Sequence, residues 1–284
     1  MAKPAALSSI NVGDIKLTYL PDGEAHIAAM GMFPASTPEG WVEHKQYLDD
    51  EGRVVSTLGG FLVETGDRKI LVDLGFGKNH VEIPDFAVFD GGRFMENLAQ
   101  TGVKPDDIDL VLYTHLHVDH TGWTSQAHGD GHRLTFSNAA HYLGAAEMKH
   151  WEQPDESGVG PSPEACLQPL QSQVEFGEDG QTVAPGVTLL ATPGHTPGHQ
   201  SIVLSSGTDR ALILGDVLHC PAQLPEAEWS VLFDVDQALA RSTREKVLAE
   251  LEDSTTMLAC SHFSEAVFGR VVRGNGKRYW QATA

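Results

Sequence analysis

Short apolar runs separated by turn residues recur along the chain. Runs at 54–64 and 69–72 flank a turn sequence, TGDR at 65–68, and predict a β-hairpin. Helical spacing of apolar residues predicts a helix that contains Phe94 and Leu98 and ends near Gly102. Further runs predict strands at 108–113, 187–191, 201–204, 211–214 and 257–260, and helices at 139–151 and 236–253. The mixture predicts an α/β protein.

The segment 21–52 departs from this pattern. It carries Met30, Met32, Phe33 and Trp41 among glycine, proline and acidic residues, which predicts a long N-terminal loop over the surface. No internal repeat, low-complexity tract or long linker divides the chain. We therefore expect 1–284 to form a single domain.

Acidic residues dominate the charge of the chain. There are 39 Asp and Glu residues against 19 Lys and Arg residues, a formal net charge of −20, whereas the 41% hydrophobic content is that of a soluble globular protein. Such a charge repels phosphate backbones and anionic lipids. We expect no nucleic acid and no membrane among the partners.

The N-terminus and the cysteines indicate a cytoplasmic protein. Residues 1–10 have no apolar stretch of signal-peptide length, and no apolar run approaches the roughly 20 residues that span a bilayer. Cys166, Cys220 and Cys260 are far apart and form no CxxC pair. This spacing favours three reduced, structural thiols over a disulfide framework or a zinc–thiolate site.

Five of the 14 histidines lie where strands are predicted to end. After the run at 108–113 the chain reads THLHVDHTG, so that His115 and His117 face one side of an extended segment and Asp119 and His120 follow at the next turn. Three more residues of ligand type stand just beyond predicted strands: His195, Asp216 and His262. Imidazole and carboxylate groups suit Zn²⁺, and Fe, Mn and Co accept the same ligands. The sequence predicts a site for two divalent metal ions.

These residues resemble the metallo-β-lactamase superfamily, whose HxHxDH motif stands here as 115–120. Asp73, His195, Asp216 and His262 match the other family positions, so the resemblance runs from about Gly59 to His262. It implies a four-layer αββα sandwich with the metal site at the edge of the two sheets. It places His115, His117 and His195 on one metal, and Asp119, His120 and His262 on the other. Asp216 would bridge the metals, and Asp73 would accept a hydrogen bond from a ligand imidazole.

The same resemblance implies a hydrolase. A hydroxide that bridges two metals would attack a lactone or another carboxylic ester, with Asp119 carrying a proton to the leaving group and Asp216 holding both metals. An organophosphate triesterase and a β-lactam hydrolase use the same kind of site and stay open. An iron-dependent oxygenase or oxidoreductase of this fold is the alternative from another class.

The surroundings of the motif resemble the branch of N-acyl homoserine lactonases and methyl parathion hydrolase. The carrying features are the long segment before the first hairpin, GDVLHCPAQLP at 215–225 and ACSHF at 259–263. Lactonases of this branch often have a tyrosine soon after the bridging aspartate, where this chain has His219.

Aromatic residues near the motif and in the segment 21–52 are candidates for the wall of a substrate pocket, core residues and homodimer contacts being the alternatives. The pocket candidates are Phe33, Trp123, His219, Trp229 and Phe233. An apolar wall of this kind suits a small uncharged or weakly charged ester or lactone.

Overall fold

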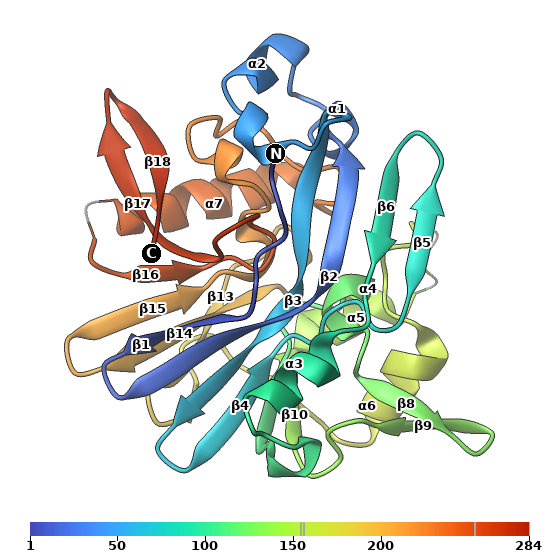
Figure 1. Cartoon of the computed structure of the whole chain (residues 1–284). Coiled ribbons are helices and arrows are strands. Elements are labelled where there is room, and N and C mark those ends of the chain that lie inside the picture. The colour runs from blue at the N-terminus through green and yellow to red at the C-terminus, as the bar shows by residue number, and fades with distance from the viewer. Residues whose placement is uncertain (154, 156, 253, 284) are drawn as a thin grey trace.

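Two β-sheets packed face to face form the centre of the protein (Figure 1). The computed structural model describes residues 1–153, 155, 157–252 and 254–283. Within these ranges, none of the helices is both long and apolar enough to cross a membrane.

The first sheet has nine strands, in the order β11-β10-β7-β4-β3-β2-β6-β5 with β1 also paired to β2. Its centre, β4, β7 and β10, is parallel, and the β1–β2, β2–β3, β3–β4 and β5–β6 pairs are antiparallel. The strands are β1 (Ser8–Val12), β2 (Ile15–Ala28), β3 (Arg53–Thr65), β4 (Arg68–Val72), β5 (His80–Ile83), β6 (Ala87–Asp90), β7 (Leu110–Leu112), β10 (Ala140–Gly144) and β11 (Val174–Gly177).

The second sheet has seven strands in sequence order, and all neighbours are antiparallel except β15 and β16. A separate hairpin of β8 and β9 lies beside the first sheet (Figure 1). The strands are β12 (Thr182–Ala184), β13 (Val187–Ala191), β14 (Gln200–Ser206), β15 (Asp209–Ile213), β16 (Met257–Ala259), β17 (Phe268–Gly274) and β18 (Lys277–Ala282), with β8 (Ser125–His128) and β9 (Gly131–Leu134) in the hairpin.

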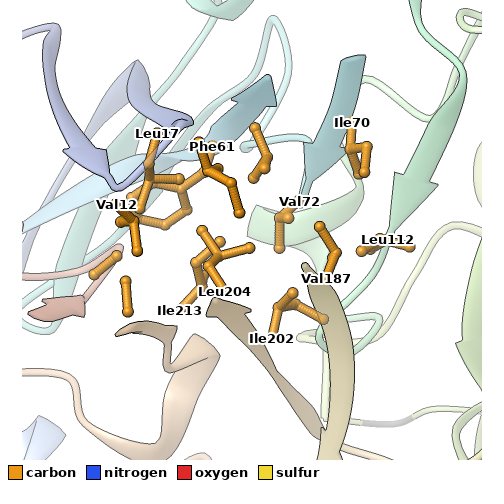
Figure 2. Close-up of a cluster of buried hydrophobic side chains, with 14 of the residues drawn as sticks. Val12, Leu17, Phe61, Ile70, Val72, Leu112, Val187, Ile202, Leu204 and Ile213 are labelled. Carbon is orange, nitrogen blue, oxygen red and sulfur yellow. The ribbon is translucent and has the colours of Figure 1, made fainter. Parts of the chain in front are cut away.

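The space between the sheets is filled by one apolar cluster. Figure 2 shows Phe61 and Val72 of the first sheet facing Ile202, Leu204 and Ile213 of the second. All five side chains are buried, as the alternation of inward and outward positions along a strand requires of a half-buried sheet. This cluster holds the two sheets together.

Helices cover both outer faces of the sheet pair. α3, α5 and α6 bury Leu98, Trp151 and Leu170 against the first sheet, and α7 buries Leu248 against the second. The predicted four-layer αββα sandwich is therefore confirmed. The helices are α1 (Ala29–Met32), α2 (Pro38–Val42), α3 (Phe94–Gln100), α4 (Val118–Thr121), α5 (Ala145–Trp151), α6 (Gln168–Gln171) and α7 (Gln237–Leu251), with 3₁₀ turns η1 (Lys45–Tyr47), η2 (Pro105–Asp107), η4 (Gly215–Val217) and η5 (Pro221–Gln223) and the π-helical turn η3 (Pro163–Leu167).

The loop predicted over 21–52 is wrong for 21–28, which continue strand β2. The pairing with β3 shifts register between Pro21 and Gly23, so both residues belong to a β-bulge. A Cβ atom at Gly23 would lie 1.7 Å from the carbonyl oxygen of Asp90, which explains the glycine. The bulge turns Asp22 inward, where its carboxylate accepts hydrogen bonds from four backbone N–H groups and from Trp123 Nε1. The remainder of the segment contains α1, α2 and η1.

The helix predicted over 139–151 is also wrong in its first part. Residues 140–144 form strand β10, parallel to β7, and only Ala145–Trp151 are helical. The side chains of β10 alternate between buried and partly buried, a period of two that the short run AHYLG does not reveal against the helical residues after it.

We expect Phe61→Ala to lower the free energy of unfolding by about 3–5 kcal/mol, because the buried ring contacts Tyr19 and Phe268 between the sheets. Urea denaturation would measure the change. Val42→Ala, at a side chain that is 68% exposed, is the control and should change stability by less than about 0.5 kcal/mol. A loss at Phe61 no larger than that of the control would contradict the assignment of this cluster as the core.

Candidate metal centre

The predicted ligand residues converge at one edge of the sandwich. Each follows the carboxyl end of a strand, and the carboxyl ends of neighbouring parallel strands lie at the same edge of a sheet. His115 and His117 follow β7, Asp119 and His120 lie in α4, His195 lies between β13 and β14, Asp216 lies in η4 after β15, and His262 follows β16. The structure brings all seven together in two groups, the first His115, His117, His195 and Asp216 and the second Asp119, His120 and His262, with the ligand atoms of each group within 4.8 Å of one another.

Hydrogen bonds at Nδ1 define the tautomers of the second group. His120 Nδ1 donates to Asp73 Oδ2 over 2.9 Å, and His262 Nδ1 donates to the carbonyl oxygen of Thr57 over 3.0 Å. In the neutral imidazole the other nitrogen then carries no proton. The two Nε2 atoms nevertheless face each other at 3.2 Å.

The first group has the same arrangement. His195 Nδ1 donates to Asp234 Oδ1 over 2.9 Å. His115 Nδ1 lies 3.0 Å from Thr114 Oγ1, whose own proton is donated to Asp73, so this imidazole is the donor. The Nε2 atoms of His115 and His195 are therefore also free of protons in the neutral rings.

All four of these Nε2 atoms surround the carboxylate of Asp216. The distance from Nε2 to an oxygen of Asp216 is 3.8 Å for His115, 3.2 Å for His120, 3.3 Å for His195 and 3.1 Å for His262. When the rings are neutral, hydrogen-bond acceptors therefore face other acceptors in a buried site. A divalent cation, or protons on the imidazoles, must lie between them.

Burial and the neighbouring charges shift the pKa values of these groups in opposite directions. Burial lowers the pKa of His115 and His117, whereas at His195 the carboxylates of Asp216 and Asp234 outweigh burial and raise the pKa to about 9. Burial would raise the pKa of Asp216, but the surrounding imidazoles hold it well below its usual range. The carboxylate is thus ionised and attracts cations.

The donor set fits divalent metal ions. The Nε2 atoms of His115 and His117 and Oδ1 of Asp216 are buried and have no hydrogen-bond partner among the described residues. Nitrogen and oxygen ligands in this number suit zinc and related ions. Asp119, whose side chain is 19% exposed, is the ligand candidate nearest to solvent.

His199 lies beside the cluster but uses both ring nitrogens within the protein. Its Nδ1 lies 3.0 Å from the carbonyl oxygen of Thr192, and its Nε2 accepts the backbone N–H of Asp216 over 2.9 Å. Burial lowers its pKa to about 3, so the ring is neutral. Its contribution is to orient Asp216.

Two buried carboxylates at the centre had no signal in the sequence. Asp234 orients His195, as described above. Glu147 of α5 accepts hydrogen bonds from the backbone N–H of Leu116, from Thr196 Oγ1, from the backbone N–H of Gly198 and from Trp151 Nε1. Neither acid belongs to a motif, and each lies more than thirty positions from the ligand segments that it contacts.

A cavity of about 1540 Å³ opens onto the metal centre. Of the predicted pocket residues, Trp123, His219 and Phe233 line it. Phe33 and Trp229 do not, because they pack with Trp41 in an apolar cluster behind the wall, at ring distances of 4.8 to 6.0 Å.

His219 is the closest of these residues to the centre. Its Nε2 lies 3.0 Å from Asp216 Oδ2, and its ring stacks on that of His262. Its Nδ1 has no hydrogen-bond partner among the described residues, so this nitrogen is free to bind a group in the cavity.

Much of the remaining cavity wall is apolar. Met32, Leu58, Phe86, Phe89, Leu232 and Phe233 contribute to it. Outside the ligand groups, Lys78 and Glu96 are the charged residues of the described lining, apart from histidine. The cavity therefore suits a ligand that is mainly apolar.

Comparisons with known proteins agree with this geometry. A family model described as the metallo-beta-lactamase superfamily matches residues 60–262. An N-acyl homoserine lactonase of Bacillus cereus is 30% identical over 168 residues, which are 54% of this chain and 60% of the relative. One of Bacillus thuringiensis is 28% identical over 207 residues, or 68% and 76% of the two chains. The match to the Bacillus cereus relative thus spans about three fifths of its length.

Among solved structures, the dizinc quorum-quenching lactonase AidC, in complex with a product, has the same fold. Its TM-score is 0.86, with 21% sequence identity, over 99% of this chain and 98% of that chain.

We expect His199→Leu to retain the metal content of the wild-type protein, because its ring nitrogens bond to backbone groups of Thr192 and Asp216 and not to the candidate ligand atoms. The free energy of unfolding of the metal-free protein should fall by about 1–3 kcal/mol, since the buried N–H of Asp216 loses its acceptor. Elemental analysis and urea denaturation in a chelator would measure the two effects. His195→Leu is the comparison and should lose metal; an equal loss in His199→Leu would contradict this account.

Proposed function

The chain belongs to the metallo-beta-lactamase superfamily, and we propose that it is a dinuclear-metal hydrolase of lactones or other carboxylic esters that carry an apolar group. The observation that carries the proposal is the set of four imidazole nitrogens around the buried, ionised carboxylate of Asp216. Nitrogen and oxygen atoms in this arrangement can act as ligands of divalent cations.

In this proposal each group of residues would hold one divalent ion, and the carboxylate of Asp216 would contribute to both sites. Its Oδ2 lies 3.3 Å from His195 Nε2 in the first group, and its Oδ1 lies 3.2 Å from His120 Nε2 and 3.1 Å from His262 Nε2 in the second, so the carboxylate contacts both groups. The bound ions would polarise a substrate oxygen and lower the pKa of a water molecule.

The protein's own residues orient the substrate and move the proton. Asp119 lines the cavity and is the most exposed of the ligand carboxylates, which suits it to carry a proton to the leaving oxygen. His219, whose Nδ1 has no hydrogen-bond partner among the described residues, would hydrogen-bond the carbonyl or leaving group of the ester.

The cavity supports an uncharged substrate with an apolar arm. Its volume of about 1540 Å³ exceeds the range of roughly 300–1,000 Å³ common for small-molecule sites, and much of its wall is apolar. The lactonase relatives support the same class, since an N-acyl homoserine lactone has both an ester ring and an acyl chain.

A glutathione thioester is a weaker candidate. Three of the four basic residues near the C-terminus that could bind its carboxylates are paired within the protein: Arg273 with Glu252, Arg278 with Glu245 and Glu252, and Lys277 with Glu226. A polyanionic nucleic acid also fits poorly with a net charge of −20.

A substrate panel on protein of known metal content tests the proposal. It would include acyl homoserine lactones of increasing chain length, a δ-lactone, an aryl acetate, a phosphotriester, a cephalosporin and a glutathione thioester. We expect two divalent ions per chain and the highest kcat/KM for a lactone or aryl ester, rising up to about fourfold for each methylene buried in the cavity. Chelation should abolish turnover, and added Zn²⁺ should restore it.

Other outcomes would contradict the proposal in different ways. A best substrate among phosphotriesters or cephalosporins would keep the two-metal site and change the substrate class. A single iron per chain with oxygen consumption would overturn the hydrolase itself.

We expect Asp119→Asn to lower kcat by about 10²- to 10⁴-fold, because an amide cannot relay the proton. Metal content measured on the same sample separates this effect from loss of a ligand. Glu96→Gln is the matched control, since Glu96 lines the same cavity outside the ligand groups. Unchanged turnover with both metals bound would exclude Asp119 as the proton carrier.

A further inference from the structure

We propose that Glu147 is a positioning residue that sets the affinity of the first metal group and leaves the second nearly unaffected. The proposal rests on the two-metal site proposed above. Glu147 touches neither the reacting atoms nor a metal ligand atom; it acts on the two chain segments that carry the ligands.

The carboxylate joins segments that are distant in sequence. Oε1 accepts the backbone N–H of Leu116, between His115 and His117, over 3.0 Å. Oε2 accepts Thr196 Oγ1 over 2.6 Å and the backbone N–H of Gly198 over 3.1 Å. Thr196 directly follows His195. One buried side chain thus fixes the spacing between the three histidines of the first group.

The same carboxylate also orients a ring that packs on a ligand. Trp151 Nε1 donates to Oε1 over 2.7 Å, and the indole meets His117 edge to face at 5.5 Å between ring centres. Glu147 is 0% exposed, so its four hydrogen bonds have no water to replace them. Loss of the carboxylate would release both segments and the ring together.

Close backbone contacts tie α5 to the segment after His195. A Cβ atom at Gly144 would lie 2.6 Å from the carbonyl oxygen of Gly198, and one at Gly198 would lie 2.1 Å from the backbone nitrogen of Glu147. Only glycine at both positions allows the start of α5 to approach this closely. The helix therefore presents Glu147 to both ligand segments at fixed distance.

The second group is anchored elsewhere. His262 is held by strand β3, through the carbonyl oxygen of Thr57 at its Nδ1 and through the bond from the Thr57 N–H to its own carbonyl oxygen. His120 is held by Asp73. No hydrogen bond of Glu147 reaches either anchor. This separation predicts that a change at Glu147 affects one metal far more than the other.

Glutamine is the informative replacement for Glu147, because it keeps the size of the side chain and replaces one of the two acceptor oxygens by an NH₂ group. Each carboxylate oxygen accepts two hydrogen bonds, and an amide NH₂ group in place of either oxygen would face two donors. Thr196→Val is a milder second variant, since it deletes one of the four bonds and keeps the carboxylate.

The test measures metal affinity in two backgrounds that each retain a single group. In His262→Ala the remaining ion binds the first group, and in His195→Ala it binds the second. Competition with a chromophoric chelator would give the Kd for Zn²⁺. We expect Glu147→Gln to raise the Kd by about 10- to 100-fold in the first background and by less than about threefold in the second. Thr196→Val should have a smaller effect with the same selectivity.

Asp22→Asn is the matched control for the loss of a buried carboxylate. Asp22 accepts five hydrogen bonds, none of them from a residue next to a ligand histidine. It should lower thermal stability and change neither Kd by more than about threefold.

The outcomes separate the two proposals. Equal weakening of both groups by Glu147→Gln and Thr196→Val, or an unchanged Kd in the first background, would overturn the positioning role while leaving the two-metal hydrolase intact. A wild-type chain that binds fewer than two ions would overturn the two-metal site and, with it, this role.

Discussion

Four imidazole nitrogens face one buried carboxylate, and the arrangement of the chain around the site depends on this constraint. Each histidine is committed through Nδ1 to an acceptor of the protein: His115 to Thr114, His120 to Asp73, His195 to Asp234 and His262 to Thr57. Buried acceptors without donors are costly, at about 1–3 kcal/mol each and more when charged. Only a cation or added protons can satisfy the cluster, so metal binding and the stability of this edge of the sandwich are linked.

Buried carboxylates organise the chain around the site in a protein that already carries a net charge of −20. Asp22, Asp73, Glu147 and Asp234 accept bonds from backbone N–H, hydroxyl, indole or imidazole groups. They hold neighbouring segments in place by directional bonds. Positive potential at the reaction centre would then come from bound ions, which also explains why the proposed substrate is uncharged or weakly charged.

The candidate ligand residues and the cavity wall differ in how well they should tolerate amino-acid substitution. The ligands stand at strand ends beside the packed core of the sheets, whereas part of the cavity wall comes from the β5–β6 hairpin at the edge of the first sheet (Figure 1). Val81 and Ile83 of β5 line the cavity and remain about 40% exposed. Substitutions in this hairpin would change the substrate preference with little effect on the core, because they alter the cavity wall and leave the contacts between the sheets in place.

The sequence alone predicted the metal chemistry, the candidate ligand residues and the order of most elements, because these depend on local spacing: four candidate ligand side chains lie within six positions, and the others directly after apolar strands. Tertiary structure decided the rest. Pro21 and Gly23 interrupt the sequence pattern of a strand, and only pairing with β3 shows that they belong to a β-bulge. Phe33 and Trp229 are distant in sequence, and they are core residues because their rings pack against each other in the fold. Asp234 is 39 positions from His195, and Glu147 joins segments 31 and 49 positions away. Hydrogen bonds between such distant residues leave no periodicity in the sequence, so only the folded chain reveals which carboxylates orient the site.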